Sequence, residues 1–172
     1  MILNDTYEWV IVNEEYDIYH ARFKIKQISK KLGFNSYEKA VMETCVSELA
    51  WNLVIHALGG KIGFMEFEAS YKVKNIKKRD FIKALKRKNQ SLIWTDENVI
   101  FIKGLEIISE DAGPGIGDID HCLSEEYVSK KGLGRGLKSV RGMMDEFQIK
   151  SRPGEGTRII VRKWLRVFQG VV

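Results

Sequence analysis

One stretch of the chain, VSELAWNLVIHAL at 46–58, constrains the fold more than any other. Its apolar residues fit a helix that is largely buried, yet Glu48, Asn52 and His56 interrupt it at intervals of four. On an α-helix this spacing places a carboxylate, a carboxamide and an imidazole above one another on a single face. Such a row makes a poor core and a good reactive surface. We therefore predict a half-buried helix that carries functional groups.

Three glycine-rich stretches follow this helix along the chain. They read DAGPGIG at 111–117, KGLGRGL at 131–137 and GEGT at 154–157. None has the spacing of a P-loop or of a dinucleotide-binding turn, and the sequence contains no HRD or DFG motif of a eukaryotic-type protein kinase. One such stretch alone is most simply a turn. Several of them behind a polar helix indicate a nucleotide site.

Hydrophobic periodicity predicts an alternation of helices and strands. Asn13 and Ser36 are the expected N-caps of the first two helices, and Gly33 is expected to end the first. The first predicted helix follows Asn13 and runs to about 32, and the second runs from 36 past 56 to 59–60. Two further helices are predicted over 118–126 and from 136 to about 145. The predicted strands are 7–12, 61–71, 99–109, 146–151 and 157–164. This pattern indicates an α+β fold, a two-layer sandwich of helices on a mostly antiparallel sheet, in a single domain over 1–172.

The positive charge of the chain is concentrated in one segment. Nine basic residues lie between Lys72 and Asn89 with only one acid, although the net charge of the whole chain is +5. We predict a basic insertion at about 72–91, which is either simply solvated or docks an acidic protein surface. Nucleic-acid and membrane contacts are disfavoured, because Phe81 is the only aromatic residue in the segment.

The remaining composition is that of a cytoplasmic protein. No apolar run approaches the roughly 18 residues needed to cross a bilayer, and the N-terminus lacks the pattern of a signal peptide. Cys45 and Cys122 are isolated, as reduced cytosolic thiols are. The sequence also lacks the CxxC and HxxxH pairs that hold zinc, which argues against such a site.

The order of the motifs resembles that of the GHKL ATPase superfamily. The four signatures of that superfamily occur in sequence as Glu48–Asn52–His56, Asp111–Gly113–Gly115, Gly132–Gly134–Gly136 and Gly154–Gly156–Thr157. Within the superfamily the chain is most similar to the serine/threonine kinases of bacterial sigma-factor regulation, especially the RsbT-type switch kinase of the stressosome. The sequence segments that carry this likeness include KKLGF, SELAWN, GLEIISEDAGPGI, KGLGRGL and MMDEFQIKSRPGEGT. The basic insertion and the short C-terminal tail depart from it.

The resemblance implies roles for the polar helix. Asn52 would offer its amide oxygen to Mg²⁺, which prefers oxygen ligands. Glu48, one turn earlier, would accept or orient the proton of an attacking hydroxyl as a general base. His56 would touch a phosphate or be a structural histidine. Asp111 would accept a hydrogen bond from the amino group of adenine, unless it only caps its own turn.

The resemblance also implies a nucleotide-binding set in the glycine loops. Gly113 and Gly115 would let the backbone approach the base, and Thr157 would contact the base through water. Arg135 would reach a phosphate or a protein substrate, or face solvent. The phosphate loop and the helix that it opens would be formed by Lys131, Gly132, Gly134, Arg135, Gly136 and Leu137.

These roles imply an ATP- and Mg²⁺-dependent protein serine/threonine kinase. The substrate would be a STAS-domain protein, either an anti-sigma-factor antagonist or a stressosome scaffold, and a regulatory phosphatase is a possible second partner. The alternative is a non-catalytic, nucleotide-dependent anti-sigma module, but such a module has no need of Glu48. A histidine-kinase catalytic domain is disfavoured, since no helix pair with a phosphoacceptor histidine is recognisable.

Overall fold

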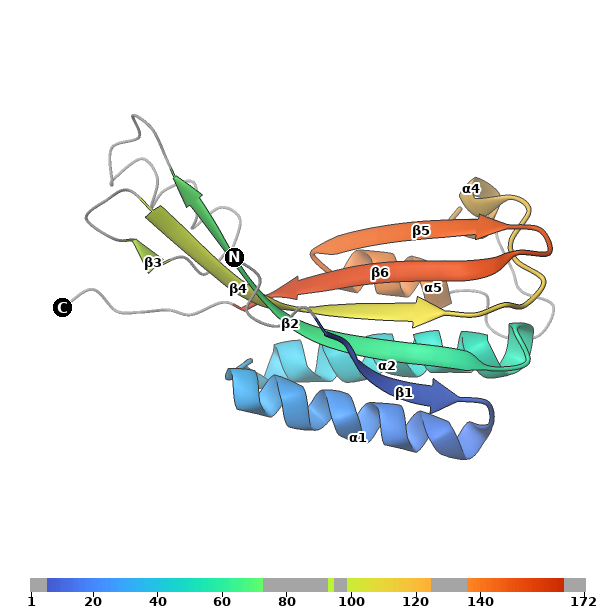
Figure 1. The fold of residues 1–172 in the computed structure, drawn as a ribbon, viewed down its shortest axis with the longest axis horizontal. Helices are drawn as coiled ribbons and strands as arrows, with labels where there is room; N and C mark the ends of the chain where they lie inside the picture. The colour runs from blue at the N-terminus through green and yellow to red at the C-terminus, as the bar shows by residue number, and fades with distance from the viewer. Residues whose placement is uncertain (1–5, 73–92, 95–98, 125–135, 166–172) are drawn as a thin grey trace.

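A computed structural model of the protein describes residues 6–72, 93–94, 99–124 and 136–165 (Figure 1). The elements in chain order are β1 (Glu8–Val12), α1 (Glu15–Leu32), α2 (Ser36–His56), β2 (Gly60–Lys72), β3 (Ile93–Trp94), β4 (Val99–Glu110), α4 (Ile119–Cys122), α5 (Gly136–Met143), β5 (Glu146–Arg152) and β6 (Gly156–Trp164). Apart from Lys72, the last residue of β2, the predicted basic insertion lies outside the described residues.

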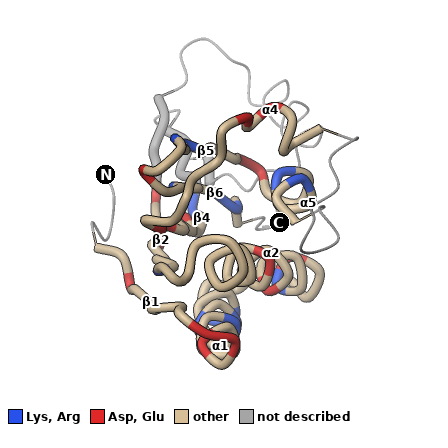
Figure 2. Tube along the Cα trace, turned by 90° about the vertical axis from the view of Figure 1, so that its right-hand side faces the viewer, with Lys and Arg blue, Asp and Glu red and all other residues tan. Residues whose placement is uncertain are grey.

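The strands form one sheet in the order β1-β2-β4-β6-β5, with β3 beside β4. The recorded pairings are all antiparallel. Helices α1, α2 and α5 lie on the same side of this sheet, as the view along the strands shows (Figure 2). The predicted α+β two-layer sandwich is therefore confirmed. The short strand β3 was not predicted.

Helix α1 begins one residue later than the sequence suggests. Its N-cap is Glu14, so the prediction that Asn13 caps it is wrong. The Asp17 carboxylate accepts the backbone N–H groups of both Asn13 and Glu14, at 2.9 and 3.1 Å, and these bonds lower the pKa of Asp17. At the other end, Gly33 has the left-handed conformation expected of it, with φ of 86°.

Helix α2 begins one residue earlier than the sequence suggests. Asn35 is its N-cap, where Ser36 was predicted. The Asn35 side chain accepts from the backbone N–H of Glu38 at 2.9 Å, and the Glu38 carboxylate accepts from that of Asn35 at 3.1 Å. This reciprocal pair satisfies two free donors at once, which Ser36 in the first turn cannot do. The helix ends at His56, three residues short of the glycines at 59–60.

The core lies between the helices and the face of the sheet that they cover. Helix α2 supplies much of it, and strands β2, β4 and β6 complete it from the other layer. One lysine enters this layer: Lys163 Nζ donates to the carbonyl of Met143 at 2.9 Å and to Asp145 at 3.2 Å. A cation at the last carbonyls of α5 favours that helix end and fixes α5 against β6.

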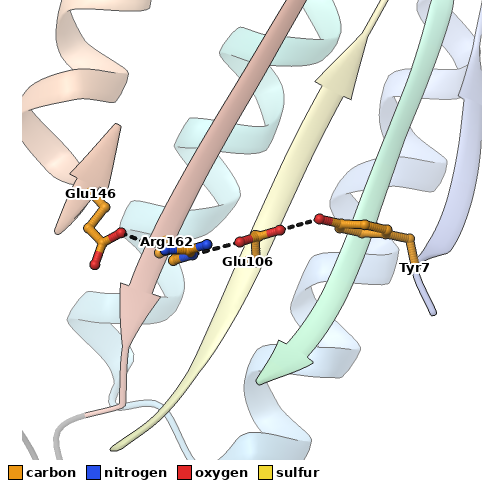
Figure 3. Close-up of polar contacts among 4 residues, drawn as sticks. All are labelled: Tyr7, Glu106, Glu146 and Arg162. Atoms are coloured by element: carbon orange, nitrogen blue, oxygen red, sulfur yellow. Dashed lines mark hydrogen bonds and ion pairs between the residues drawn. The ribbon is translucent and has the colours of Figure 1, made fainter. Parts of the chain in front are cut away.

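The other face of the sheet is not covered by α1, α2 or α5, and polar pairs between the described strands hold it. Four side chains cross it in a row, from Tyr7 to Glu106 on β4, Arg162 on β6 and Glu146 on β5 (Figure 3). Arg162 contacts Glu106 at 2.6 Å and Glu146 at 2.8 Å. Burial, followed by the hydrogen bond to Glu106, raises the pKa of Tyr7 to about 12.

A second row of charges crosses the same open face nearer the end of the strands. Glu110 on β4 contacts Lys61 at 3.2 Å and Arg158 at 3.1 Å. Lys61 also lies 4.1 Å from the ring centroid of Trp9. Among the described residues, no helix has the length and apolar character to cross a membrane.

Candidate nucleotide site

Asp111 follows β4, and two backbone groups fix its carboxylate. Oδ1 accepts the N–H of Gly113 at 2.8 Å and the N–H of Thr157 at 3.1 Å. The backbone N–H of Asp111 donates in turn to the Thr157 carbonyl at 3.0 Å. The described residues place no hydrogen bond on Oδ2. Asp111 therefore caps its own turn, which was the structural alternative to a role in binding adenine. It also presents a second, oriented carboxylate oxygen.

The loop after Asp111 is bonded to the β5–β6 hairpin. Gly154 donates its N–H to the Pro114 carbonyl at 2.8 Å. Gly115 has φ of +69°, and a Cβ added there would lie 2.0 Å from the Arg152 carbonyl oxygen. Only glycine fits so close an approach of two backbones. The second and fourth motifs are thus parts of one structure.

The same loop abuts the end of α2. A Cβ on Gly113 would lie 2.6 Å from the Cα atom of Ala57, the residue that caps α2. His56 precedes Ala57 and is exposed. The first motif therefore meets the second through the helix end, and both glycines of that second motif are needed for close packing.

Helix α5 brings Gly136, its first residue and the last glycine of the third motif, to the polar face of α2. A Cβ on Gly136 would lie 2.7 Å from Glu48 Oε2. Glu48 and Asn52 are both half-buried. The Asn52 Nδ2 atom is buried and makes no hydrogen bond within the part of the chain that the structure describes. A buried amide without a partner is costly in a purely structural role.

Other predicted site residues are placed less directly. Leu137 packs against the core, so a contact with nucleotide would come from its backbone. Lys131, Gly132, Gly134 and Arg135 lie outside the described residues. The structure therefore brings together Glu48, Asn52, His56, Asp111, Gly113, Gly115, Gly136 and Thr157 from the predicted set.

Ser151 on β5 belongs to this arrangement and was not predicted. Its Oγ accepts the N–H of Ile116 at 2.8 Å, bonds the carbonyl of Gly156 at 2.9 Å and lies 2.9 Å from the Thr157 hydroxyl. Ser151 faces Thr157 directly in the hairpin register. The one signal in the sequence is its position across the predicted turn from Thr157, which only a correct register would have revealed.

A cavity of about 860 Å³ opens at the same end of the sheet. Asp111, Gly156 and Thr157 line it, as do Lys61 and Arg158 from the charged row of the open face. Glu48 and Asn52 are not among its lining residues. Since that charged row points away from the helices, the cavity lies at the rim of the open face. The bonds of Asp111, not this cavity, define the candidate site.

Known proteins are similar to this chain over nearly its whole length. Serine/threonine-protein kinase RsbT of Bacillus subtilis (strain 168) is 35% identical over 157 residues, which are 91% of this chain and 96% of RsbT. The anti-sigma F factor of Clostridium kluyveri is 30% identical over 83% of this chain and 82% of its own. That of Caldanaerobacter subterraneus subsp. tengcongensis is 26% identical over 96% and 97%. No family model matches the chain. The likeness to RsbT shows that the protein belongs to the RsbT-type serine/threonine-protein kinases of the GHKL superfamily.

Proposed function

We propose that the protein phosphorylates a serine or threonine hydroxyl on a STAS-domain partner, with ATP as the phosphoryl donor and Mg²⁺ as the metal. The observation that carries the proposal is the convergence of Glu48 and Asn52, from the first motif, with Asp111, from the second. Asp111 is held by two backbone bonds, and Glu48 lies against the start of α5. The similarity to RsbT supports the reaction class.

The donor set fits an adenine nucleotide and a magnesium ion. Asp111 Oδ2 is a fixed acceptor for an exocyclic amino group. Asn52 would hold the metal through its neutral amide oxygen. Among the described residues no group of three His, Cys, Asp or Glu side chains could form a metal cage, so phosphate and water oxygens would complete the shell. The bound metal would neutralise charge on the phosphates.

Glu48 is the residue that makes this site catalytic in our proposal. Its carboxylate reaches the first residue of α5, where a phosphate would also meet free backbone N–H groups. From there Glu48 would orient the partner's hydroxyl and accept its proton. Glutamine has the same shape but cannot take the proton, so it isolates this role.

The partner and the setting are inferred from the family to which the chain belongs. We propose that the substrate is an anti-sigma-factor antagonist or a stressosome scaffold in the cytoplasm. A phosphate on that surface would add a charge of about −1.5 to −2 and weaken its hold on the kinase. The released kinase would then engage a second partner, such as a regulatory phosphatase.

The test is phosphoryl transfer from labelled ATP to candidate STAS proteins by the wild type and Glu48→Gln. We expect transfer to fall about 10²- to 10⁴-fold in the variant, while ATP affinity stays within about twofold. The matched control is Glu43→Gln, because Glu43 lies on the same helix about 140° away from Glu48. Undiminished transfer by Glu48→Gln would rule out the general-base role.

The alternative function is partner binding without catalysis. It is favoured by the similarity to proteins called anti-sigma F factors. A wild-type protein that binds ATP and captures a sigma factor, yet phosphorylates none of the STAS proteins, would replace our proposal with this one.

A further inference from the structure

We propose that Ser151 sets the base specificity of the nucleotide site by fixing the direction of the Thr157 hydroxyl. The inference rests on the proposed nucleotide site and adds to it a positioning residue. It predicts a preference for purines with a 6-amino group over those with a 6-oxo group.

Ser151 has a single proton to share among three hydrogen-bond neighbours. A serine hydroxyl donates one hydrogen bond and accepts two. The Gly156 carbonyl, 2.9 Å away, can only accept, so the single Ser151 proton points to it. The Ile116 N–H, 2.8 Å away, can only donate, so it fills one lone pair of Ser151.

The remaining contact of Ser151 is with the Thr157 hydroxyl. Thr157 Oγ1 lies 2.9 Å from Ser151 Oγ, and either atom could in principle be the donor. Ser151 has no proton left, so Thr157 must donate into the second lone pair of Ser151. All three bonding positions of Ser151 are then used. The Thr157 hydroxyl faces any ligand with lone pairs alone.

Thr157 is also bonded to Asp111. The Thr157 N–H donates to Asp111 Oδ1 at 3.1 Å, so the two residues form one wall of the site. Asp111 Oδ2 is an acceptor, and Thr157 Oγ1 is also an acceptor because its proton is donated to Ser151. A wall of acceptors matches the amino group of adenine. It repels a 6-oxo group, because the carbonyl oxygen would face Asp111 Oδ2 and Thr157 Oγ1 with no donor between them.

The sharpest pair of ligands is ATP and ITP, which differ at position 6 and in the proton on the neighbouring ring nitrogen. We would measure the affinities of the full chain for both by calorimetry. The variants are Ser151→Ala, Thr157→Val and the double variant. Thr44→Val is the control, since Thr44 is exposed and its hydroxyl donates to the Ala40 carbonyl of its own helix.

We expect the wild type and Thr44→Val to prefer ATP equally. Ser151→Ala frees the Thr157 hydroxyl to turn and donate, so the ATP-to-ITP preference should fall roughly three- to tenfold, the range of one hydrogen bond. Thr157→Val should lower it by a similar factor. In the Thr157→Val background, Ser151→Ala should change the preference no further. A merely structural Ser151 would instead lower both affinities together.

Several results would overturn the inference. They are an unchanged preference in Ser151→Ala, a further loss in the double variant, or a wild type that binds ATP and ITP alike. If Ser151→Ala does not fold, an unchanged preference in Thr157→Val overturns it equally. A wild type that binds neither nucleotide would refute the proposed nucleotide site itself, which separates the two failures.

Discussion

Alternate residues of the same strands build two very different faces of the sheet. On β4, Ile107 faces the helices and Glu106 and Ile108 face the open side. The covered face is an apolar core closed by α1, α2 and α5, while cross-strand pairs such as Arg162 with Glu106 hold the open face. The candidate site stands where the covered face ends, at Asp111.

This difference separates stability from chemistry. The apolar face fixes which residues of β4 and β6 meet, and this register carries Asp111 to Thr157. The polar rows on the open face tie the same strands together but contribute no group to the bonds around Asp111. We therefore expect changes on the open face to alter stability and leave nucleotide affinity nearly unchanged.

The largest expected effect compares two neighbours, Ile107 and Ile108, which are both 0% exposed. Ile107→Ala opens a cavity between helices and sheet and should lower the free energy of unfolding by about 2–5 kcal/mol. Ile108 lies against Gly63 near the ring of Trp9, which is 41% exposed and can settle into the gap more easily than a core side chain. We expect Ile108→Ala to cost about half as much. Urea unfolding measures both, and an equal or larger loss for Ile108→Ala would contradict the comparison.

A smaller effect is expected from Glu106→Gln on the open face. Glu106 is 4% exposed and bonds both Tyr7 and Arg162, so loss of its charge should lower the free energy of unfolding by about 1–3 kcal/mol. Nucleotide affinity should stay within about twofold. Glu155→Gln is the control, because the ion pair that Glu155 makes with Arg152 is exposed and worth about 0–1 kcal/mol. A large loss of affinity in Glu106→Gln would show that the two faces are coupled.

The smallest effect is expected from Tyr7→Phe, and it depends on pH. The Tyr7 pKa is raised from 10.0 to about 12 in the folded protein, so the protonated phenol is the form that stabilises the fold. Because Tyr7 is only half-buried, solvent screens its bond to Glu106 and we expect only about 1 kcal/mol. This advantage over Tyr7→Phe should be complete below pH 10 and disappear as pH rises through about 12. Unfolding of both proteins across that range tests it, and a difference that grows with pH would refute the assignment.

The fold could be predicted from the sequence because most of its elements have strong local signals. The polar row on 46–58 gave α2, and the turn at 152–156 gave the hairpin. The predicted helix caps were wrong by one residue. The capping residue is decided by the side chain three residues further along the chain, Asp17 in α1 and Glu38 in α2. Strand β3 was missed because two residues have no periodicity and exist only by pairing with β4.

The candidate site could be predicted in its residue types but not in its contacts. The motifs indicated Asp111 and Thr157, yet the close packing of Gly113 on Ala57 and of Gly136 on Glu48 depends on tertiary structure. Ser151 carried no signal of its own, because its role depends on the partners that the hairpin register provides.

The central claim is that Asp111 anchors an adenine nucleotide at the end of the covered face. Calorimetry of ATP with Mg²⁺ against the wild type and Asp111→Asn tests it most directly. Asparagine can still accept the N–H groups of Gly113 and Thr157, but it then turns a donor toward the adenine amino group. We expect ATP affinity to fall roughly 10- to 100-fold, as the loss of a charge-assisted hydrogen bond predicts. Equal affinity in a folded Asp111→Asn protein would contradict the account.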